Sequence, residues 1–418
     1  MTSRYSLWAL MREGLKSAPA WGAAWRDAAP GPAYDVVIVG GGGHGLACAY
    51  YLAKNHGIRN VAVIEKGWIG GGNSGRNTTV VRSNYYYPAS ARLYDFSVDL
   101  YEKLHSELNY NIMFSQRGMI TLAHSRHDME AAVKWVGAMN ANGVATRMLT
   151  RADIARAVPF LDMSADARYP VLGGFAQEKA GTARHDAVVW GYARAADRLG
   201  VDIIQNCAVT GFMRSADGAI AGVETTRGTI ACGRVGLAVA GSSTTLADLA
   251  GFRLPVSSYA LQAFVSEPIK PVIDTVVLSL ATGMYVSQSD KGGLVVGGGL
   301  DHYLSYAQRG NLPVAGNVLG ALAEQFPALA RVRLLRQWAG IVDVVADSSP
   351  ILGRTPVPGL FINCGWGTGG FKAIPAGGTL LAHHIATGDP HPLAAPFSLD
   401  RFSTGALIDE AGASGIAH

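Results

Sequence analysis

The sequence is short of cysteine, of charged residues and of long apolar runs, and each shortage argues against a class of protein. Its four cysteines are Cys48, Cys207, Cys232 and Cys364. They stand far apart without CxxC or metal-ligand spacing, which predicts no metal site and indicates buried thiols in a cytoplasmic protein. No stretch approaches the about 18 uninterrupted apolar residues of a membrane span. The net charge of +4 is spread along the chain without a basic block, so nucleic-acid binding has little support.

The first 34 residues differ in kind from the rest of the chain. They contain three tryptophans, mixed charge and a Pro/Gly break. They lack a long apolar core with a small-residue cleavage site, so a secretory signal is not predicted, and Glu13 and Asp27 count against an organelle presequence. Because an exposed tryptophan-rich arm promotes aggregation, we expect residues 1–34 to dock on the body or on a partner subunit.

Glycine is in excess, with 52 of 418 residues. The glycines stand beside Val, Ile and Leu runs, which favours tight turns and close approach of the backbone to a bound group. A chain of this length predicts two closely connected lobes.

The strongest motif lies near the start of the chain. Residues 35–39 indicate a buried strand, 46–55 a helix and 60–65 a second strand, with Gly40-x-Gly42-x-x-Gly45 as the turn between the first strand and the helix. Such glycines let a pyrophosphate approach the helix N-terminus, and Glu65 is placed to accept hydrogen bonds from a ribose. The alternative is a glycine-rich turn in an unoccupied α/β sheet. The expected contacts here are Gly40, Gly42, Gly43, His44, Gly45, Glu65 and Lys66.

Two further glycine-rich segments, residues 67–88 and 363–378, favour FAD over a nicotinamide. An extended FAD must be held at its isoalloxazine as well as at its adenine, whereas a nicotinamide enzyme has no evident use for the second segment. Residues 234–251 indicate an apolar strand and a helix that return the chain to the nucleotide sheet. The expected FAD contacts in these later segments are Asn73, Ser74, Thr78, Val80, Val209, Gly367, Gly370 and Lys372.

Residues 181–203 predict an amphipathic helix that begins at His185 and is ended by Gly200. The apolar face carries Val188, Tyr192, Ala195 and Leu199. On the residues alone, His185 is a polar residue at a helix start with a satisfied hydrogen bond.

Together these segments resemble the FAD-dependent amine oxidases of the D-amino-acid oxidase and sarcosine oxidase group. They resemble most closely the β subunits of heterotetrameric bacterial sarcosine oxidases, through strings such as FSQRGMITLAH, ARHDAVVWGYARAA, GIVDVVADSSPILG and GWGTGGFK. The resemblance implies that non-covalent FAD oxidises the N-methyl group of sarcosine to glycine and formaldehyde. It also implies FMN joined covalently to His185, with Arg184 and Lys179 placed to attract its phosphate. Electrons would then pass from FAD to FMN and to O2, giving H2O2, in a complex with a larger α subunit and two small subunits.

The chemistry requires fixed cations that clamp the substrate carboxylate. Arg82 and Lys372 are the two candidates, and Lys372 is also placed to stabilise superoxide. The alternatives are a solvated loop arginine and an ordinary surface lysine. The resemblance also implies two departures: this sequence has Gly340 where the monomeric sarcosine oxidases have a flavin-linked cysteine, and Val295 where other oxidases of the family have a lysine. Possible pocket residues are His302, Tyr285 and Tyr87, and His44 is expected to touch the pyrophosphate region without transferring a proton.

The expected fold is a mixed α/β architecture with a Rossmann-like FAD domain and an antiparallel-sheet substrate domain. We expect residues 35–90, 150–255 and 330–385 in the first, 91–149 and 256–329 in the second, and a C-terminal tail at 386–418 that wraps the surface or a partner. Two rival functions remain: a stand-alone FAD-dependent amine or D-amino-acid dehydrogenase, and a non-catalytic flavin-binding subunit.

Overall fold

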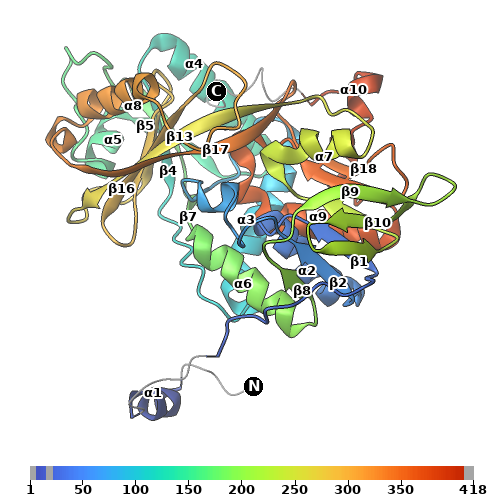
Figure 1. The fold of residues 1–418 in the computed structure, drawn as a ribbon. Helices are drawn as coiled ribbons and strands as arrows, with labels where there is room; N and C mark the ends of the chain where they lie inside the picture. The colour runs from blue at the N-terminus through green and yellow to red at the C-terminus, as the bar shows by residue number, and fades with distance from the viewer. Residues whose placement is uncertain (1–5, 16–21, 409–418) are drawn as a thin grey trace.

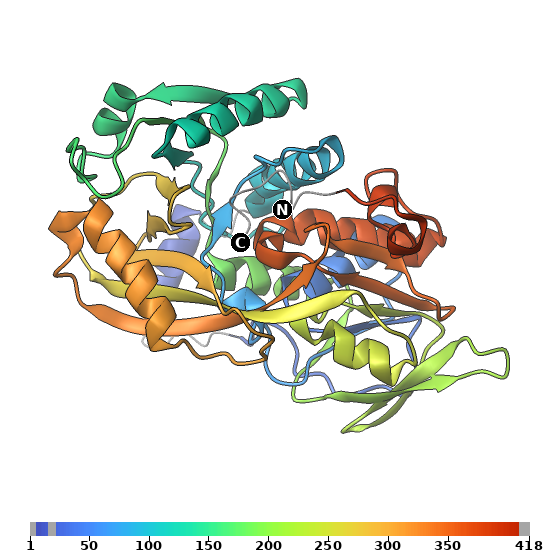
Figure 2. The same ribbon diagram turned by 90° about the horizontal axis from the view of Figure 1, so that it is seen from above.

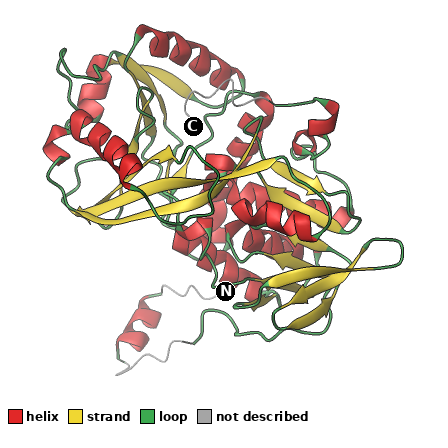
Figure 3. Cartoon of the chain, turned by 45° about the horizontal axis from the view of Figure 1, so that its top comes forward, coloured by secondary structure: helices red, strands yellow, loops and turns green. Residues whose placement is uncertain are grey.

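The computed structural model describes residues 6–15 and 22–408. The chain forms two lobes, each built on its own sheet, and the long strands β13 (Val256–Pro268) and β17 (Leu334–Val345) run from one lobe towards the other (Figures 1 and 2). Figure 3 shows the strands gathered in these two groups with the helices packed around them. This is the mixed α/β fold expected from the sequence.

The first lobe contains a six-stranded sheet whose centre is parallel and whose edge strand β18 is antiparallel. The strand Val36–Val39 is buried along its whole length, as an apolar run in a parallel sheet predicts. The strands in order across the sheet are β18 (Ile351–Arg354), β19 (Leu360–Cys364), β12 (Val235–Leu237), β1 (Val36–Val39), β2 (Val61–Ile64) and β8 (Asp202–Ile204).

Different elements cover the two faces of this sheet. Val36 and Ile38 point into a core shared with helices α2 (Gly43–His56), α3 (Pro88–Glu107), α6 (His185–Arg198) and α9 (Ile374–Thr387). Val37 and Val39 point into the opposite core, because successive side chains of a strand alternate between faces. That second face is covered by the strands β9 (Val209–Arg214), β10 (Ile220–Thr225) and β11 (Gly228–Ala231) and by helix α7 (Ser243–Leu249).

The second lobe contains an eight-stranded sheet. It is antiparallel except where β14 runs parallel to β4, a mixed pairing that the sequence did not predict. Helices α5 (Arg151–Ala157) and α8 (Leu312–Gln325) pack on one face and α4 (Arg126–Ala141) on the other. The strands in order are β17, β13, β16 (Gly293–Leu300), β15 (Tyr285–Gln288), β14 (Val276–Ser279), β4 (Met119–Ala123), β6 (Gly173–Gln177) and β5 (Thr146–Thr150).

The sheets do not follow the expected domain limits at every point. Strands β6 and β17 fall in ranges expected to belong to the FAD domain, yet both belong to the eight-stranded sheet. The reason is pairing: β6 bonds to β4 and β5, and β17 bonds along its whole length to β13. A chain that crosses between lobes within one strand has no single boundary residue.

The expected helix at residues 181–203 is confirmed as α6, which begins at His185. Gly200 follows it with a φ of +100°, the left-handed conformation that favours glycine. The remaining elements are α1 (Leu7–Gly14), η1 (Asn73–Gly75), β3 (Val80–Val81), β7 (Gly181–Thr182), η2 (Ala240–Ser242), η3 (Pro327–Leu329), η4 (Gly367–Gly369), η5 (Phe371–Ala373), η6 (Ala395–Phe397) and α10 (Arg401–Thr404).

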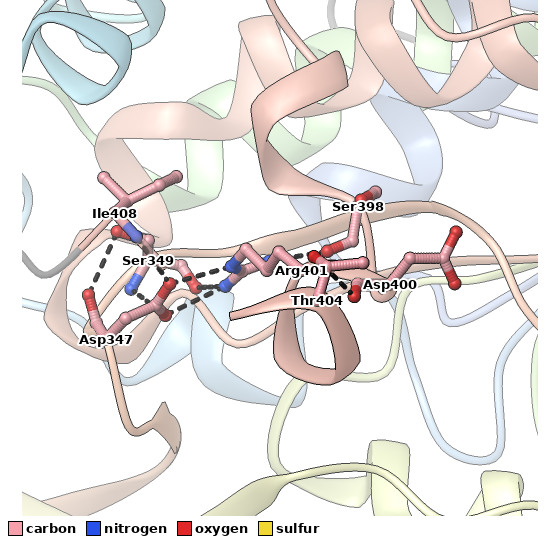
Figure 4. Close-up of polar contacts among 7 residues, drawn as sticks. All are labelled: Asp347, Ser349, Ser398, Asp400, Arg401, Thr404 and Ile408. Carbon is pink, nitrogen blue, oxygen red and sulfur yellow. Dashed lines mark hydrogen bonds and ion pairs between the residues drawn. The ribbon is translucent and has the colours of Figure 1, made fainter. Parts of the chain in front are cut away.

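The ends of the chain differ in how they meet the body. Helix α1 exposes its apolar side chains, Trp8 at 75% and Leu10 at 68%. The C-terminal tail is fastened instead, because the guanidinium of Arg401 forms two hydrogen bonds of 2.8 and 2.9 Å with the buried carboxylate of Asp347 (Figure 4). No helix among residues 6–15 and 22–408 is both long and apolar enough to cross a membrane.

Candidate functional site

A cavity of about 850 Å³ connects the nucleotide turn of the first lobe with the eight-stranded sheet of the second. Its wall is made by the segments that the sequence singled out, together with parts of β13, β16 and β17. Of the predicted site residues, those that line it are Gly40, Gly42, Gly43, His44, Glu65, Lys66, Asn73, Ser74, Thr78, Val80, Arg82, Val209, Gly367, Gly370 and Lys372.

The glycines of the nucleotide turn are required by close backbone contacts. Gly40 has a φ of +111°, and a Cβ there would lie 2.4 Å from the carbonyl oxygen of Ala238. A Cβ on Gly45 would lie 1.9 Å from the carbonyl oxygen of Gly40, so Gly45 supports the turn from outside the cavity wall. Gly42 is the N-cap of α2, and the N-terminus of a helix favours an anion. The N–H of Gly43 donates to the Ser74 hydroxyl at 2.9 Å. The turn therefore fits the pyrophosphate of a dinucleotide.

Glu65 is held at the end of β2. Its two carboxylate oxygens accept the main-chain N–H groups of Gly41 and Gly67, at 2.8 and 2.9 Å. Each carboxylate oxygen can accept a further hydrogen bond, so the side chain can still receive ribose hydroxyls in the cavity. Glu65 thus orders the turn and faces the position that a ribose would take.

The loop between β2 and β3 is fastened to the second lobe by Asn73. The Asn73 amide donates to the carbonyl of Ile341 at 2.6 Å and accepts the N–H of Ile341 at 2.9 Å. Gly340, beside this pair, also lines the cavity. Cys364 is buried in β19, and burial raises its pKa well above the usual value, so it behaves as a core thiol. The arrangement suits a flavin held without a thioether to either residue.

The two predicted cations, Arg82 and Lys372, meet in the cavity although 290 residues separate them in the sequence. Both are buried, with 9% and 5% of their surface exposed. Burial lowers the pKa of Lys372 well below the usual lysine value, and the charge of Arg82 lowers it further. Two cations with little access to water favour an anionic group between them.

Side chains of helix α3 position Lys372 by bonding to the main chain of Lys372 and its neighbour. The hydroxyls of Ser97 and Tyr101 donate to the carbonyls of Lys372 and Phe371, both at 2.7 Å. The Lys372 ammonium donates to the carbonyl of Thr368 at 2.9 Å. The ammonium is therefore held on the wall of the cavity.

Tyr285 is the third polar group at this end of the cavity. Its hydroxyl lies 2.9 Å from that of Thr78, and burial raises its pKa, while the charge of Arg82 opposes that rise. Its ring occupies space left by Gly297, where a Cβ would approach the tyrosine hydroxyl to 2.2 Å. Of the other possible pocket residues, His302 lines the cavity and Tyr87 does not.

His44 connects the two glycine-rich segments. Its Nε2 lies 2.8 Å from the Gly370 carbonyl, and its Nδ1 lies 3.2 Å from the amide nitrogen of Asn363. Nε2 must therefore carry the proton and Nδ1 must accept, which is the neutral ring. Burial lowers the pKa of His44 to about 4, so the ring stays neutral near pH 7. This geometry supports a structural role at the turn.

Sequence reasoning missed Asp343, a carboxyl group on the cavity wall with 2% of its surface exposed. It accepts the N–H of Gly365 at 2.5 Å, and burial raises its pKa to about 7. The available signal was an acidic residue inside an apolar strand, GIVDVV. Asp343 holds the start of the loop that carries Lys372.

His185 and Arg184 lie outside the cavity lining. Burial lowers the pKa of His185, which leaves a neutral imidazole at the start of α6. Arg184 bonds to Asp186, and Lys179 lies 3.6 Å from Asp99, so both cations already face carboxylates. The link to the cavity is short, because β7, which leads into α6, pairs with β3, where Val80 lines the wall.

The sequence model of the FAD dependent oxidoreductase family, DAO, matches residues 35–384. The chain belongs to this family. It is an FAD-dependent oxidoreductase, and the cavity that joins the nucleotide turn to the Arg82 and Lys372 pair is the candidate site for its flavin.

The chain is also similar to several named proteins. The chain is 54% identical to the sarcosine oxidase subunit beta of Rhodobacter capsulatus over 99% of its own length and 100% of the relative's. It is also 54% identical to the sarcosine oxidase subunit beta of Rhizobium meliloti, over 98% of each chain. Among solved structures, L-proline dehydrogenase from P. horikoshii matches with a TM-score of 0.84 and 28% identity, over 91% of this chain and 100% of that one.

Proposed function

We propose that this chain is the β subunit of a sarcosine oxidase and that it oxidises the N-methyl group of sarcosine to yield glycine and formaldehyde. The observation that carries the proposal is the meeting of Arg82 and Lys372 in the same cavity as the nucleotide turn. Sarcosine is a small amino acid whose carboxylate needs such cations. The identity to sarcosine oxidase β subunits, over almost the full chain, supports this substrate.

Different residues of the cavity have different proposed roles in binding the substrate. Arg82 presents a planar guanidinium that suits a carboxylate, and its ring contact with Tyr85, 4.9 Å from the ring centroid, fixes its plane. Lys372 supplies a second positive charge from the opposite glycine-rich segment. Bound FAD supplies the acceptor for the two electrons of the amine. The apolar walls keep water out, which strengthens both charge interactions.

The direct test is anaerobic mixing with sarcosine, followed by the loss of flavin absorbance. We expect the purified chain with its partner subunits to be reduced by sarcosine. Arg82→Ala should raise the half-saturating concentration about 100-fold, because two hydrogen bonds to a charged group contribute about 3 kcal/mol. Arg126→Ala, at an exposed ion pair with Glu130, is the matched control and should change nothing. Equal reduction in wild type and Arg82→Ala would contradict the proposal.

We also propose that His185 carries FMN as a covalent adduct, with FAD bound without a covalent link. The neutral imidazole supports this assignment, because a neutral ring nitrogen is a nucleophile. Arg184 is the proposed phosphate partner, which requires it to turn from Asp186 towards the ligand. The test is acid denaturation followed by mass analysis of the peptide 181–198. An FMN-sized increment that is absent in His185→Ala supports the site, and complete release of flavin from the wild-type chain overturns it.

Electron transfer onward from the flavins to O2, with release of H2O2, completes the proposed activity in the cytoplasm. The larger α subunit and two small subunits are the proposed partners, since the relatives are named as subunits. The rival reading is a stand-alone dehydrogenase that reduces a carrier. Stoichiometric peroxide during turnover, and co-purification with a larger chain, favour the oxidase; turnover without peroxide by the isolated chain favours the rival.

A further inference from the structure

The edge of the eight-stranded sheet carries a basic and apolar surface, here called the β17 face. It is formed by the first residues of β17 and by the loop that leads into α8. Leu312 is 84% exposed, Leu335 66% and Leu334 47%. Large apolar side chains gathered at a sheet edge mark interaction surfaces in soluble proteins. The β17 face consists of Arg309, Leu312, Arg333, Leu334, Leu335 and Arg336.

Contacts between the loop and the strand show that the two parts of the β17 face adjoin. The carbonyl of Gln308 accepts the N–H of Ala339 at 3.2 Å, and the side-chain amide of Gln337 donates to the carbonyl of Asn311 at 3.2 Å. The loop 308–311 therefore lies beside Gln337 to Ala339, directly after the residues of β17 that include Leu335 and Arg336.

Strand β17 is an edge strand, and part of its outer edge is open. The outward N–H groups of Ala339 and Ile341 are bonded by Gln308 and by the Asn73 side chain. Because outward groups recur every second residue in an antiparallel pair, the N–H and C=O of Gln337 also face outward. No described residue bonds to these two groups. The main-chain groups of Gln337 thus remain for an added segment, which would run from Leu334 and end where the loop 308–311 meets the strand.

The charges of the β17 face are unbalanced. Between residues 302 and 337 the chain has four arginines and a single acid, Glu324. Glu324 bonds to Arg168, and the one carboxylate bonded at this end of β17 in the described chain, that of Glu267, accepts the main-chain N–H of Arg333 at 3.0 Å. No described carboxylate forms an ion pair with the guanidinium of Arg309, Arg333 or Arg336. Arginine is common at the centre of protein interfaces, where a partner carboxylate can pair with its planar group. The missing partner is therefore acidic.

We propose that the β17 face binds an extended, acidic segment of another subunit of the same oxidase, which adds a strand beside β17. This inference rests on the proposed subunit role. The open edge at Gln337 supplies main-chain hydrogen bonds, Leu334 and Leu335 supply apolar contacts, and Arg333 and Arg336 supply the charge that selects an acidic segment. Arg309 and Leu312 extend the contact along the loop.

The test uses the chain purified with its partner subunits. Arg333→Glu combined with Arg336→Glu should weaken assembly at least tenfold, measured as the dissociation constant by sedimentation at physiological salt, because both charges would then repel the segment. The matched control is Arg59→Glu with Arg253→Glu, because these two arginines are exposed and form no ion pair with any residue of the described chain; this variant should assemble normally. Thermal unfolding and sarcosine-dependent flavin reduction of each isolated variant report whether the fold and the proposed chemistry survive.

Hydrogen exchange on the wild-type chain provides a readout that does not depend on any variant. The amides of Leu335 and Gln337 should exchange at least tenfold more slowly in the assembly than in the free chain, and a photo-crosslinker at Leu335 should attach to another subunit. Unchanged exchange, a crosslink to a second copy of this chain, or normal assembly of the doubly reversed variant would overturn the inference. Absence of sarcosine-dependent flavin reduction in the wild type would instead count against the proposed function. The interface measurements would still test the binding surface, because they do not depend on the reaction.

Discussion

Removal of the Arg401 side chain should destabilise the protein far more than removal of an exposed arginine. Arg401 is 2% exposed and bonds to both oxygens of Asp347 and, at 2.7 Å, to the carbonyl of Ser349 (Figure 4). In Arg401→Ala the Asp347 carboxylate stays buried and keeps, among residues 6–15 and 22–408, two long contacts, from the N–H of Ile408 at 3.2 Å and that of Ser349 at 3.4 Å. A buried charge left without its partner costs about 3–5 kcal/mol.

Urea denaturation followed by tryptophan fluorescence measures this loss as a change in the free energy of unfolding. Arg126→Ala removes an exposed pair and should cost below about 1 kcal/mol. The double variant Arg401→Ala with Asp347→Ala should recover part of the loss, because no charge then remains buried. If Arg401→Ala costs no more than Arg126→Ala, the ion pair does not hold the tail, and the magnitude reasoned from burial is wrong.

Three further outcomes test the flavin site. Lys372→Met should lower the rate of flavin reduction by sarcosine about 100-fold, since it removes a fixed charge from a dry site, and stopped-flow measurement of reduction and reoxidation separately shows which step uses the ammonium. Glu65→Gln should raise the dissociation constant for FAD about tenfold in a fluorescence titration, since the neutral amide is a weaker acceptor for ribose hydroxyls. Burial raises the pKa of Asp343 to about 7, whereas in the unfolded state this group loses its proton above about pH 4. The folded state therefore holds a proton that the unfolded state has released, and the free energy of unfolding should fall as the pH rises from about 4 to about 7. In Asp343→Asn that slope should disappear from unfolding curves recorded between pH 4 and 8, and an unchanged slope would assign it to another group.

The strand, turn, helix and strand of the nucleotide-binding motif could be predicted because the residues that form them are close together in the sequence. Strand, turn, helix and second strand occupy residues 35–65 without interruption, and β1, α2 and β2 appear there within a few residues of the expected limits. The position of Gly45 also follows from local geometry, since a Cβ there would meet the carbonyl of Gly40 in the same turn, whereas Gly40 meets Ala238 from a distant part of the chain. A pattern whose contacts lie within one supersecondary unit can be interpreted from the sequence.

The cavity could be predicted only in part, because its contacts join distant segments. Arg82 and Lys372 were identified through the family resemblance, and their meeting depends on how both lobes pack. The bond from His44 to Gly370 spans 326 residues, and no periodicity indicates it. The membership of β17 in the larger sheet is likewise set by its pairing with β13, not by its own apolar pattern.

Asp343 and Asp347 show how contacts with distant parts of the chain determine the pKa of a buried carboxyl group. The two carboxyl groups stand four residues apart, and both are buried, at 2% and 1% exposure. Burial raises the pKa of each, but at Asp347 the hydrogen bonds and charge of Arg401 outweigh burial and lower it below the usual value. At Asp343 burial is opposed by main-chain N–H groups and not by a cation, so burial prevails and raises the pKa to about 7. The same residue type is therefore an ionised anchor for the tail at one position and, at the other, a carboxyl group that titrates near neutral pH on the wall of the cavity.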